Sequence, residues 1–272
     1  MRLFRLLALL CITVCATGCG LPDSYFLQPP AVGNLASPLG TPFSITGTDR
    51  GSDTGATFLG YELYYKFYGN NSDSTFNSDL TSFGTGSTNT DLQQAGFHRL
   101  CLGLSSVPAL AADASAGYAS APLINIDAID SGNINKSYTI TIKLNDEAPP
   151  SPVPPVSPAG TGPPTSYYTY TPPGGSAPTA YAEVRRFVTL VPGPGCKTFQ
   201  SNGNNSYSLA TNYDVGNDAD LSSAVWSQVI PPNNGNIYVM MYAFSYGKSL
   251  IDGTPIYSSP VNLGTVYIPV YP

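Results

Sequence analysis

Residues Thr57–Tyr68 read TFLGYELYYKFY, and their side chains alternate in character at every second position. Alternation with this period is typical of a β-strand. The sequence therefore predicts a strand with Glu62 and Lys66 on the same face, where we expect the two to form an ion pair. One face carries Tyr61, Leu63, Tyr65 and Phe67, and the other carries Glu62, Tyr64, Lys66 and Tyr68.

A second long run, Asn236–Tyr246 (NIYVMMYAFSY), is apolar on both faces, as expected for a central strand. No long amphipathic helix is evident, although Ser105–Ala121 and Asp218–Val229 could each hold a short helix. The pattern predicts an all-β fold. Further strands are expected at Ser137–Leu144, Ala182–Leu190 and Thr254–Tyr271 (broken by Pro260), with weaker candidates at Phe97–Leu104 and Pro122–Asp127.

The composition of the 272 residues excludes several classes of protein. Only 10% of residues are charged, against roughly 25% in typical soluble domains. The 11 basic and 17 acidic residues give a net charge of −6, which cannot easily supply the basic face of a nucleic-acid-binding protein. The Ala, Glu, Lys and Leu content of a coiled coil is missing, and the 27 glycines follow no collagen period. A β-rich, loop-rich protein remains.

The first residues have the features of an export signal. Arg2 and Arg5 precede the apolar run Leu6–Val14, which is too short to span a bilayer but fits a signal-peptide core. The following Ala16–Cys19 (ATGC) resembles the lipobox of bacterial lipoproteins. This resemblance implies that 1–18 is a signal peptide and that Cys19 is acylated. The alternative is an ordinary secretory signal that leaves Cys19 free.

The resemblance to lipoproteins also predicts location. The mature chain is acidic, so the acyl chains rather than charge would hold it on an anionic membrane surface. Gly20 is not the aspartate that retains lipoproteins in the inner membrane, and this implies the outer membrane, with its surface and periplasmic faces both open. We expect the segment 19–36 to be a lipidated tether.

Two cysteines remain after the signal peptide and the lipidated residue are set aside. In an oxidising compartment, Cys101 and Cys196 would most simply form one disulfide. Such a bond would close a long loop and stabilise the fold by about 4–5 kcal/mol in the chain-entropy account. Two separate buried thiols are the alternative.

The segment Pro149–Thr179 differs from the rest of the chain. It contains 11 of the 26 prolines and none of the charged residues. Proline removes backbone donors, so we expect an extended, mobile surface loop that forms no strand ladder. A recognition loop for an extracellular partner is the alternative, with Tyr167, Tyr168 and Tyr170 at its centre.

Two segments are similar to the fibronectin type III pattern. Gly60–Lys66 (GYELYYK) resembles the third strand of that family, and Tyr238–Phe244 (YVMMYAF) with Tyr257–Pro260 (YSSP) resembles its sixth strand and the approach to its seventh. The tryptophan usual in the second strand of that family is absent. The resemblance implies an immunoglobulin/fibronectin III-like sandwich over 37–272 with long insertions, in which these segments share a sheet. Two small β-domains divided at the proline-rich segment are the alternative.

The sequence contains no clear catalytic constellation. His98 is the only histidine, and no Gly-x-Ser-x-Gly, HExxH or phosphate-binding glycine motif is present. We expect His98 to be structural or exposed. The acidic turns Asp49–Asp53 and Asp214–Asp220 do not match a calcium-binding loop, so no metal and no cofactor is expected. The 19 tyrosines suit either an aromatic binding surface or ordinary strands.

These observations predict a lipid-anchored envelope protein with a structural or binding role and no catalysis. Its expected partners are the membrane, through the acyl chains, and a protein or glycan ligand, but not nucleic acid. A glycan-acting hydrolase, which would need two suitably placed carboxylates, and an accessory subunit of an envelope machine are the alternatives.

Overall fold

The computed structural model describes residues 27–33, 36–38, 42–48, 52–53, 55–105, 123–130, 137–144, 166–175, 177–189, 194–197, 207–208, 223–229 and 235–271. The helices in this part are α2 (Ser74–Ser82), α3 (Asn89–Gln94), α5 (Ile126–Asp130) and α6 (Ser223–Val229). The strands are β1 (Ala31–Val32), β2 (Ala36–Pro38), β3 (Phe43–Thr48), β4 (Ser52–Asp53), β5 (Ala56–Tyr68), β6 (His98–Ser105), β7 (Ile124–Asn125), β8 (Ser137–Lys143), β9 (Tyr167–Thr171), β10 (Ala180–Thr189), β11 (Pro194–Lys197), β12 (Tyr207–Ser208), β13 (Asn236–Ser249), β14 (Pro255–Tyr257) and β15 (Val261–Tyr271).

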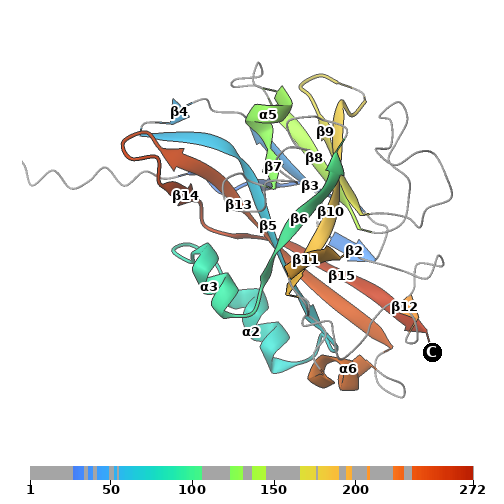
Figure 1. Ribbon diagram of the computed structural model, residues 1–272. Helices are drawn as coiled ribbons and strands as arrows, with labels where there is room; N and C mark the ends of the chain where they lie inside the picture. The colour runs from blue at the N-terminus through green and yellow to red at the C-terminus, as the bar shows by residue number, and fades with distance from the viewer. Residues whose placement is uncertain are drawn as a thin grey trace, which may run out of the picture.

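The described strands form one folded-over, mainly antiparallel sheet, which confirms the all-β prediction (Figure 1). One half has the order β1-β3-β8-β9-β10, and the other has the order β5-β13-β15. Strand β6 joins them, because its first residues pair with β5 and the rest pair with β10. The long pairs β5–β13 and β13–β15 are antiparallel, so the segments similar to fibronectin type III strands do share a sheet.

The two halves of the sheet pack face to face, as in a sandwich. Their shared apolar core takes Ile45, Ile140 and Tyr168 from the first half and Leu63 and Met241 from the second. All five side chains are fully buried. The predicted alternation of β5 is confirmed, because Tyr61, Leu63, Tyr65 and Phe67 all enter this core.

The opposite face of β5 and β13 is also covered. Tyr64, Tyr242 and Phe244 pack there against residues of α2 and α3, including Phe76 and Leu92. Figure 1 shows these two helices lying against the outer side of the second half-sheet. Because β13 is buried on both faces, its continuous apolar sequence is explained.

Helices α2 and α3 were not predicted from the sequence, although each has a recognisable start. The Asp73 side chain accepts a hydrogen bond from the Thr75 amide at 2.6 Å and so caps α2. Thr88 and Asp91 form a capping box at α3, in which each side chain accepts from the other residue's backbone amide. Helix α6 falls within the expected Asp218–Val229, whereas most of Ser105–Ala121 lies outside the described residues.

The prediction of an extended proline-rich loop is wrong for its C-terminal part. Residues Tyr167–Thr171 form β9, which pairs with β8 on one side and β10 on the other. Tyr167, Tyr168 and Tyr170 are buried, so they do not form a recognition loop. The physical reason is local, because this short run contains no proline and consists of tyrosine and threonine, which favour strands. Residues 149–165 lie outside the described part.

The predicted tether is folded at its C-terminal end. Leu27 is buried, and β1 pairs with β3 immediately afterwards. The Ser245 hydroxyl donates a hydrogen bond to the Gln28 carbonyl oxygen at 2.7 Å. The chain is therefore fixed to the body from Leu27 onward, earlier than the predicted boundary at Ala36.

Gly60 lies where the backbones of β5 and β7 approach each other closely. Its φ is +153°, and a β-carbon there would lie 1.8 Å from the Ile124 carbonyl oxygen. We expect Gly60→Ala to lower the free energy of unfolding by about 3 kcal/mol or more, because the backbone of β7 must move. Denaturant titration of purified protein would measure it. Gly84→Ala is the control, because nothing lies within 4 Å of that position. Equal effects of the two changes would contradict the close approach.

Candidate functional site

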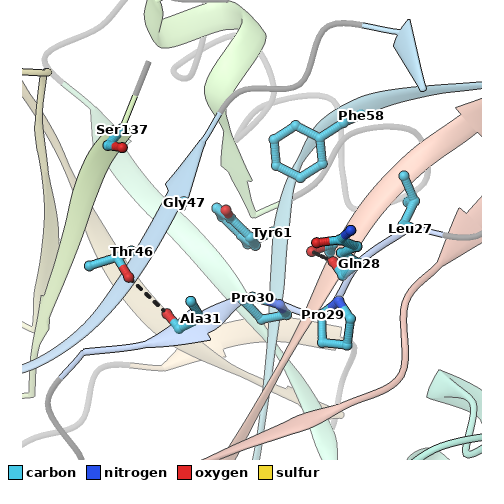
Figure 2. A pocket seen from close by; sticks show the side chains of 11 residues that line it. Leu27, Gln28, Pro29, Pro30, Ala31, Thr46, Gly47, Phe58, Tyr61 and Ser137 are labelled. Atoms are coloured by element: carbon cyan, nitrogen blue, oxygen red, sulfur yellow. Dashed lines mark hydrogen bonds between the residues drawn. The ribbon is translucent and has the colours of Figure 1, made fainter. Parts of the chain in front are cut away.

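A pocket of about 250 Å³ opens beside the first described residues (Figure 2). The segment Leu27–Ala31 forms one wall, and Thr46 and Gly47 of β3 contribute another. Phe58 and Tyr61 extend from β5 toward the space between them, as Figure 2 shows. We call this the N-terminal pocket; its described lining is Leu27, Gln28, Pro29, Pro30, Ala31, Thr46, Gly47, Phe58, Tyr61, Ser137 and Ser245.

Gly47 makes room for a pair of tyrosines behind the pocket. The hydroxyls of Tyr61 and Tyr138 are 2.8 Å apart and hydrogen-bonded. A β-carbon at Gly47 would lie 2.2 Å from the Tyr61 hydroxyl oxygen and 2.7 Å from that of Tyr138. A side chain at this position of β3 would therefore force the two tyrosine hydroxyls to shift, including that of the tyrosine that forms part of the pocket surface.

The described lining of the N-terminal pocket is polar but carries no acidic, basic or imidazole side chain. It offers hydroxyl groups, one carboxamide and two aromatic rings, those of Phe58 and Tyr61, which meet edge to face at a centroid distance of 5.3 Å. Neutral hydrogen-bonding groups beside aromatic rings can orient an uncharged polar ligand.

A second group of polar residues lies on the helix-covered face of β5. We call Glu62, Tyr64, Lys66 and Tyr68 the polar strip. At one end, Arg99 Nη2 lies 3.0 Å from Glu62 Oε1, and the Tyr64 hydroxyl donates to Glu62 Oε2 at 2.9 Å. Burial raises the pKa of Glu62, and the Arg99 charge and the Tyr64 hydrogen bond offset part of that rise. Burial, together with the Glu62 carboxylate, raises the pKa of Tyr64, which keeps its hydroxyl a donor.

At the other end of the polar strip, the Lys66 ammonium holds both helices. It donates to Asp79 Oδ2 of α2 at 2.5 Å and to the carbonyl oxygen of Ala95, at the end of α3, at 2.7 Å. The Tyr68 hydroxyl donates to the same carboxylate oxygen at 2.6 Å, and burial raises the Tyr68 pKa. The ammonium also lies 5.5 Å from the centre of the Phe97 ring.

The expected Glu62–Lys66 ion pair is therefore wrong. Glu62 pairs with Arg99, and Lys66 pairs with Asp79. Strand β6 and helix α2 bring these partners onto the face of β5, and alternation within one strand cannot reveal them. Each carboxylate is buried beside a cation, so the Glu62–Arg99 pair joins β5 to β6 and the Asp79–Lys66 pair joins α2 to β5.

The structure describes only some of the residues that the sequence predicted as site residues. Cys19 and the turn Asp214–Asp220 lie outside the described residues, as do most of Asp49–Asp53. His98 is half-buried at the start of β6, opposite Tyr65, with ring centroids 5.9 Å apart. The described residues contain no group of three or more histidine, cysteine or acidic side chains suited to a metal ion.

Cys101 and Cys196 lie on two strands that flank β10. Cys101 is opposite Arg185, and Cys196 is opposite Phe187. Strands on either side of a third are about 9.5 Å apart in a regular sheet, whereas a disulfide needs α-carbons within about 7 Å. No disulfide is found among the described residues, and the side chains of both cysteines lie outside them. The bond stays a prediction that requires locally closer strands.

The tyrosine content is explained mainly by the core. Tyrosines of β5, β8, β9 and β13 are buried in the described part of the chain. This favours the interpretation of tyrosine as a strand residue with a polar tip. The N-terminal pocket itself was missed, because its walls come from distant segments; Gly47 between Thr46 and Thr48 was the only local signal of close packing.

Comparison with known proteins adds no family: no family model, curated protein or solved structure matches this chain. Among the described helices, none has the length and apolar character needed to cross a bilayer.

The buried Glu62 carboxyl predicts a specific pH dependence. Its pKa is raised above 4.5 in the folded state, so the folded protein binds more protons than the unfolded chain in the window above that value. The stabilisation by the neutral carboxyl is complete below about pH 4.5 and is lost as the pH rises through the folded pKa. We therefore expect wild-type stability, relative to Glu62→Gln, to fall as the pH rises through this window.

Denaturant titrations of both proteins across the acidic range would measure this difference. Asp91→Asn is the control with the opposite sign. The backbone hydrogen bond from Thr88 is the main cause that lowers the Asp91 pKa, so the wild type should gain stability over that variant as the pH rises to 3.8 and keep that gain above it. A wild-type advantage over Glu62→Gln that rises with pH would contradict a raised Glu62 pKa.

Proposed function

We propose that this protein is a lipid-anchored component of a bacterial envelope, held through acylated Cys19, with a binding or structural role and no catalytic one. The observation that carries the proposal is the succession of Arg2 and Arg5, the apolar run Leu6–Val14 and the lipobox-like Ala16–Cys19. Two or three acyl chains on Cys19 would hold the protein stably on a membrane. Gly20 supports the outer membrane as its location.

The short length of chain between Cys19 and the buried Leu27 supports a body held close to that membrane. Leu27 is buried in the body, and only seven residues lie between it and Cys19. The eight steps from Cys19 to Leu27 span no more than about 28 Å even in a fully extended chain. The body would therefore operate near the bilayer surface rather than at the end of a long stalk.

The N-terminal pocket supports a binding role. Its described lining combines hydroxyl groups, a carboxamide and two aromatic rings without any acidic or basic side chain. A charged ligand would find no opposite charge there. The hydroxyls of Thr46, Tyr61 and Ser245 already hydrogen-bond within the protein, but a hydroxyl oxygen keeps a lone pair to which a ligand hydroxyl can donate. We propose an uncharged, hydroxyl-rich ligand of the size of one or two sugar units.

We further propose that the body is one composite immunoglobulin/fibronectin III-like domain with long insertions. Support comes from the adjacent antiparallel strands β5, β13 and β15, which correspond in order to the strands suggested by the sequence resemblance. The pairing of β8 with β9 across the proline-rich segment supports one domain rather than two.

The anchor can be tested by metabolic labelling with palmitate in a bacterial host. We expect label in the wild-type protein and none in Cys19→Ala, because acylation needs the thiol of that cysteine. Cys15→Ala is the matched control, since it removes a nearby cysteine that would leave with the signal peptide, and its labelling should equal that of the wild type. Label that persists in Cys19→Ala would overturn the proposed anchor.

The ligand class can be tested by saturation-transfer NMR with a panel of neutral mono- and disaccharides. We expect binding by the wild type and loss of at least about tenfold in affinity for Thr46→Arg, whose side chain would occupy the N-terminal pocket. Thr46 is exposed, so the change should not disturb the core. Thr90→Arg, on the exposed side of α3, should bind normally. Binding equal in both variants, or absent from the wild type for all sugars, would contradict the proposal.

A further inference from the structure

The turn between β13 and β14 exposes two adjacent large apolar side chains. Leu250 is 57% exposed and Ile251 is 75% exposed, more than any other large hydrophobic residue among those described. Figure 1 shows this hairpin at one end of the molecule, away from α6 and the C-terminus. We call Leu250 and Ile251 the hairpin tip.

The fold of the turn does not require apolar residues at the hairpin tip. The backbone is fixed by the Ser249 amide, which donates to the Thr254 carbonyl oxygen at 2.9 Å, and by Gly253, whose φ is +70°. The Asp252 carboxylate accepts from the Thr254 amide at 3.1 Å and from its hydroxyl at 2.8 Å. Turns of this kind usually carry polar residues, so Leu250 and Ile251 point to something outside the described structure that they contact.

The N-terminal segment leads toward the same end of the molecule. Gln28 is bonded to Ser245 of β13, whereas Leu27, one residue closer to the N-terminus, lies against Gly247. From Gln28 to Leu27, the chain therefore moves along β13 toward the hairpin tip. The distance from Gly247 to Ile251 is at most about 14 Å along a strand, shorter than the reach of the eight residue-to-residue steps from Leu27 to Cys19.

We propose that the hairpin tip inserts into the interfacial region of the bilayer that holds the lipid anchor. This inference rests on the proposed acylation of Cys19. The insertion would bury two aliphatic side chains, and it would not need to be strong by itself. Because the anchor keeps the tip near the surface, insertion becomes an intramolecular event with a high effective concentration.

The charged residues beside the hairpin tip do not oppose its contact with a lipid bilayer. Along the chain, the charged residues nearest to the hairpin tip are Lys248 and Asp252, which carry opposite charges. The Asp252 carboxylate is already bound to Thr254 of its own turn. The residues that flank the tip in the chain therefore add no net charge beside its two aliphatic side chains, and a zwitterionic lipid surface could receive it.

The test places a fluorescent probe on the hairpin tip of the lipidated mature protein. Ile251→Trp would be reconstituted into vesicles of phosphatidylcholine, with and without bromine on the acyl chains near the headgroup. We expect bromine to reduce the emission of the introduced tryptophan by about twofold, since an inserted side chain lies at that depth. Leu80→Trp is the matched control, because Leu80 is also apolar and 42% exposed but lies on α2.

Native Trp226 is buried and also fluoresces, so the wild-type protein in the same vesicles gives the background emission. Flotation of the vesicles separates the two proposals. Protein that floats with the vesicles but shows no quenching at position 251 would overturn the insertion and leave the anchor standing. Protein that does not float would overturn the anchor; the same variants, attached through a hexahistidine tag at position 19 to nickel-chelating lipids, would then test insertion alone.

Discussion

The antiparallel pairing of β5 with β13 is the constraint on which the rest of the described structure depends. Both strands are long, and both carry apolar side chains on their two faces. Such a pair cannot lie at the surface of a sandwich with one face in water, because it would expose a large apolar area. One face is covered by the first half of the sheet, and the other requires the additional layer formed by α2 and α3.

The helix layer explains why charged residues occur on a buried strand face. Lys66 holds the Asp79 side chain of α2 and the Ala95 carbonyl of α3 at once, so it fixes both helices against β5. Removing these charges from water costs several kcal/mol, and the ion pairs recover much of that cost. Their contribution to net stability is therefore small, whereas a helix docked in a different register would leave Lys66 buried without its partners Asp79 and Ala95. We infer that Lys66 and Tyr68 specify where the helices sit more than they strengthen the fold, whereas the Glu62–Arg99 pair joins β5 to β6.

The strands could be predicted from the sequence, whereas their covering layers could not. The alternation of Tyr61 to Tyr68 and the apolar run of β13 are local patterns, and the structure follows them. The partners of Glu62 and Lys66 come from β6 and α2, so no pattern within β5 contains them. Strand β9 was missed because the prolines around it dominated the composition of its segment. The capping box at Thr88 was a readable signal for α3, but the helix is short and its apolar period is weak.

The segment Leu27–Ala31 links the proposed anchor to the proposed ligand site. It is the first described part of the chain, it is bonded to the body through Gln28 and Ser245, and it also forms a wall of the N-terminal pocket. Movement of the anchor relative to the body would therefore act directly on that wall, unless a second contact with the bilayer held the body in place. The hairpin tip would supply such a contact, because it lies on the same strand that binds Gln28 and Leu27. Two attachment points on one end of β13 would leave the body little freedom to tilt, and the pocket wall would keep its shape while the protein stays on the membrane.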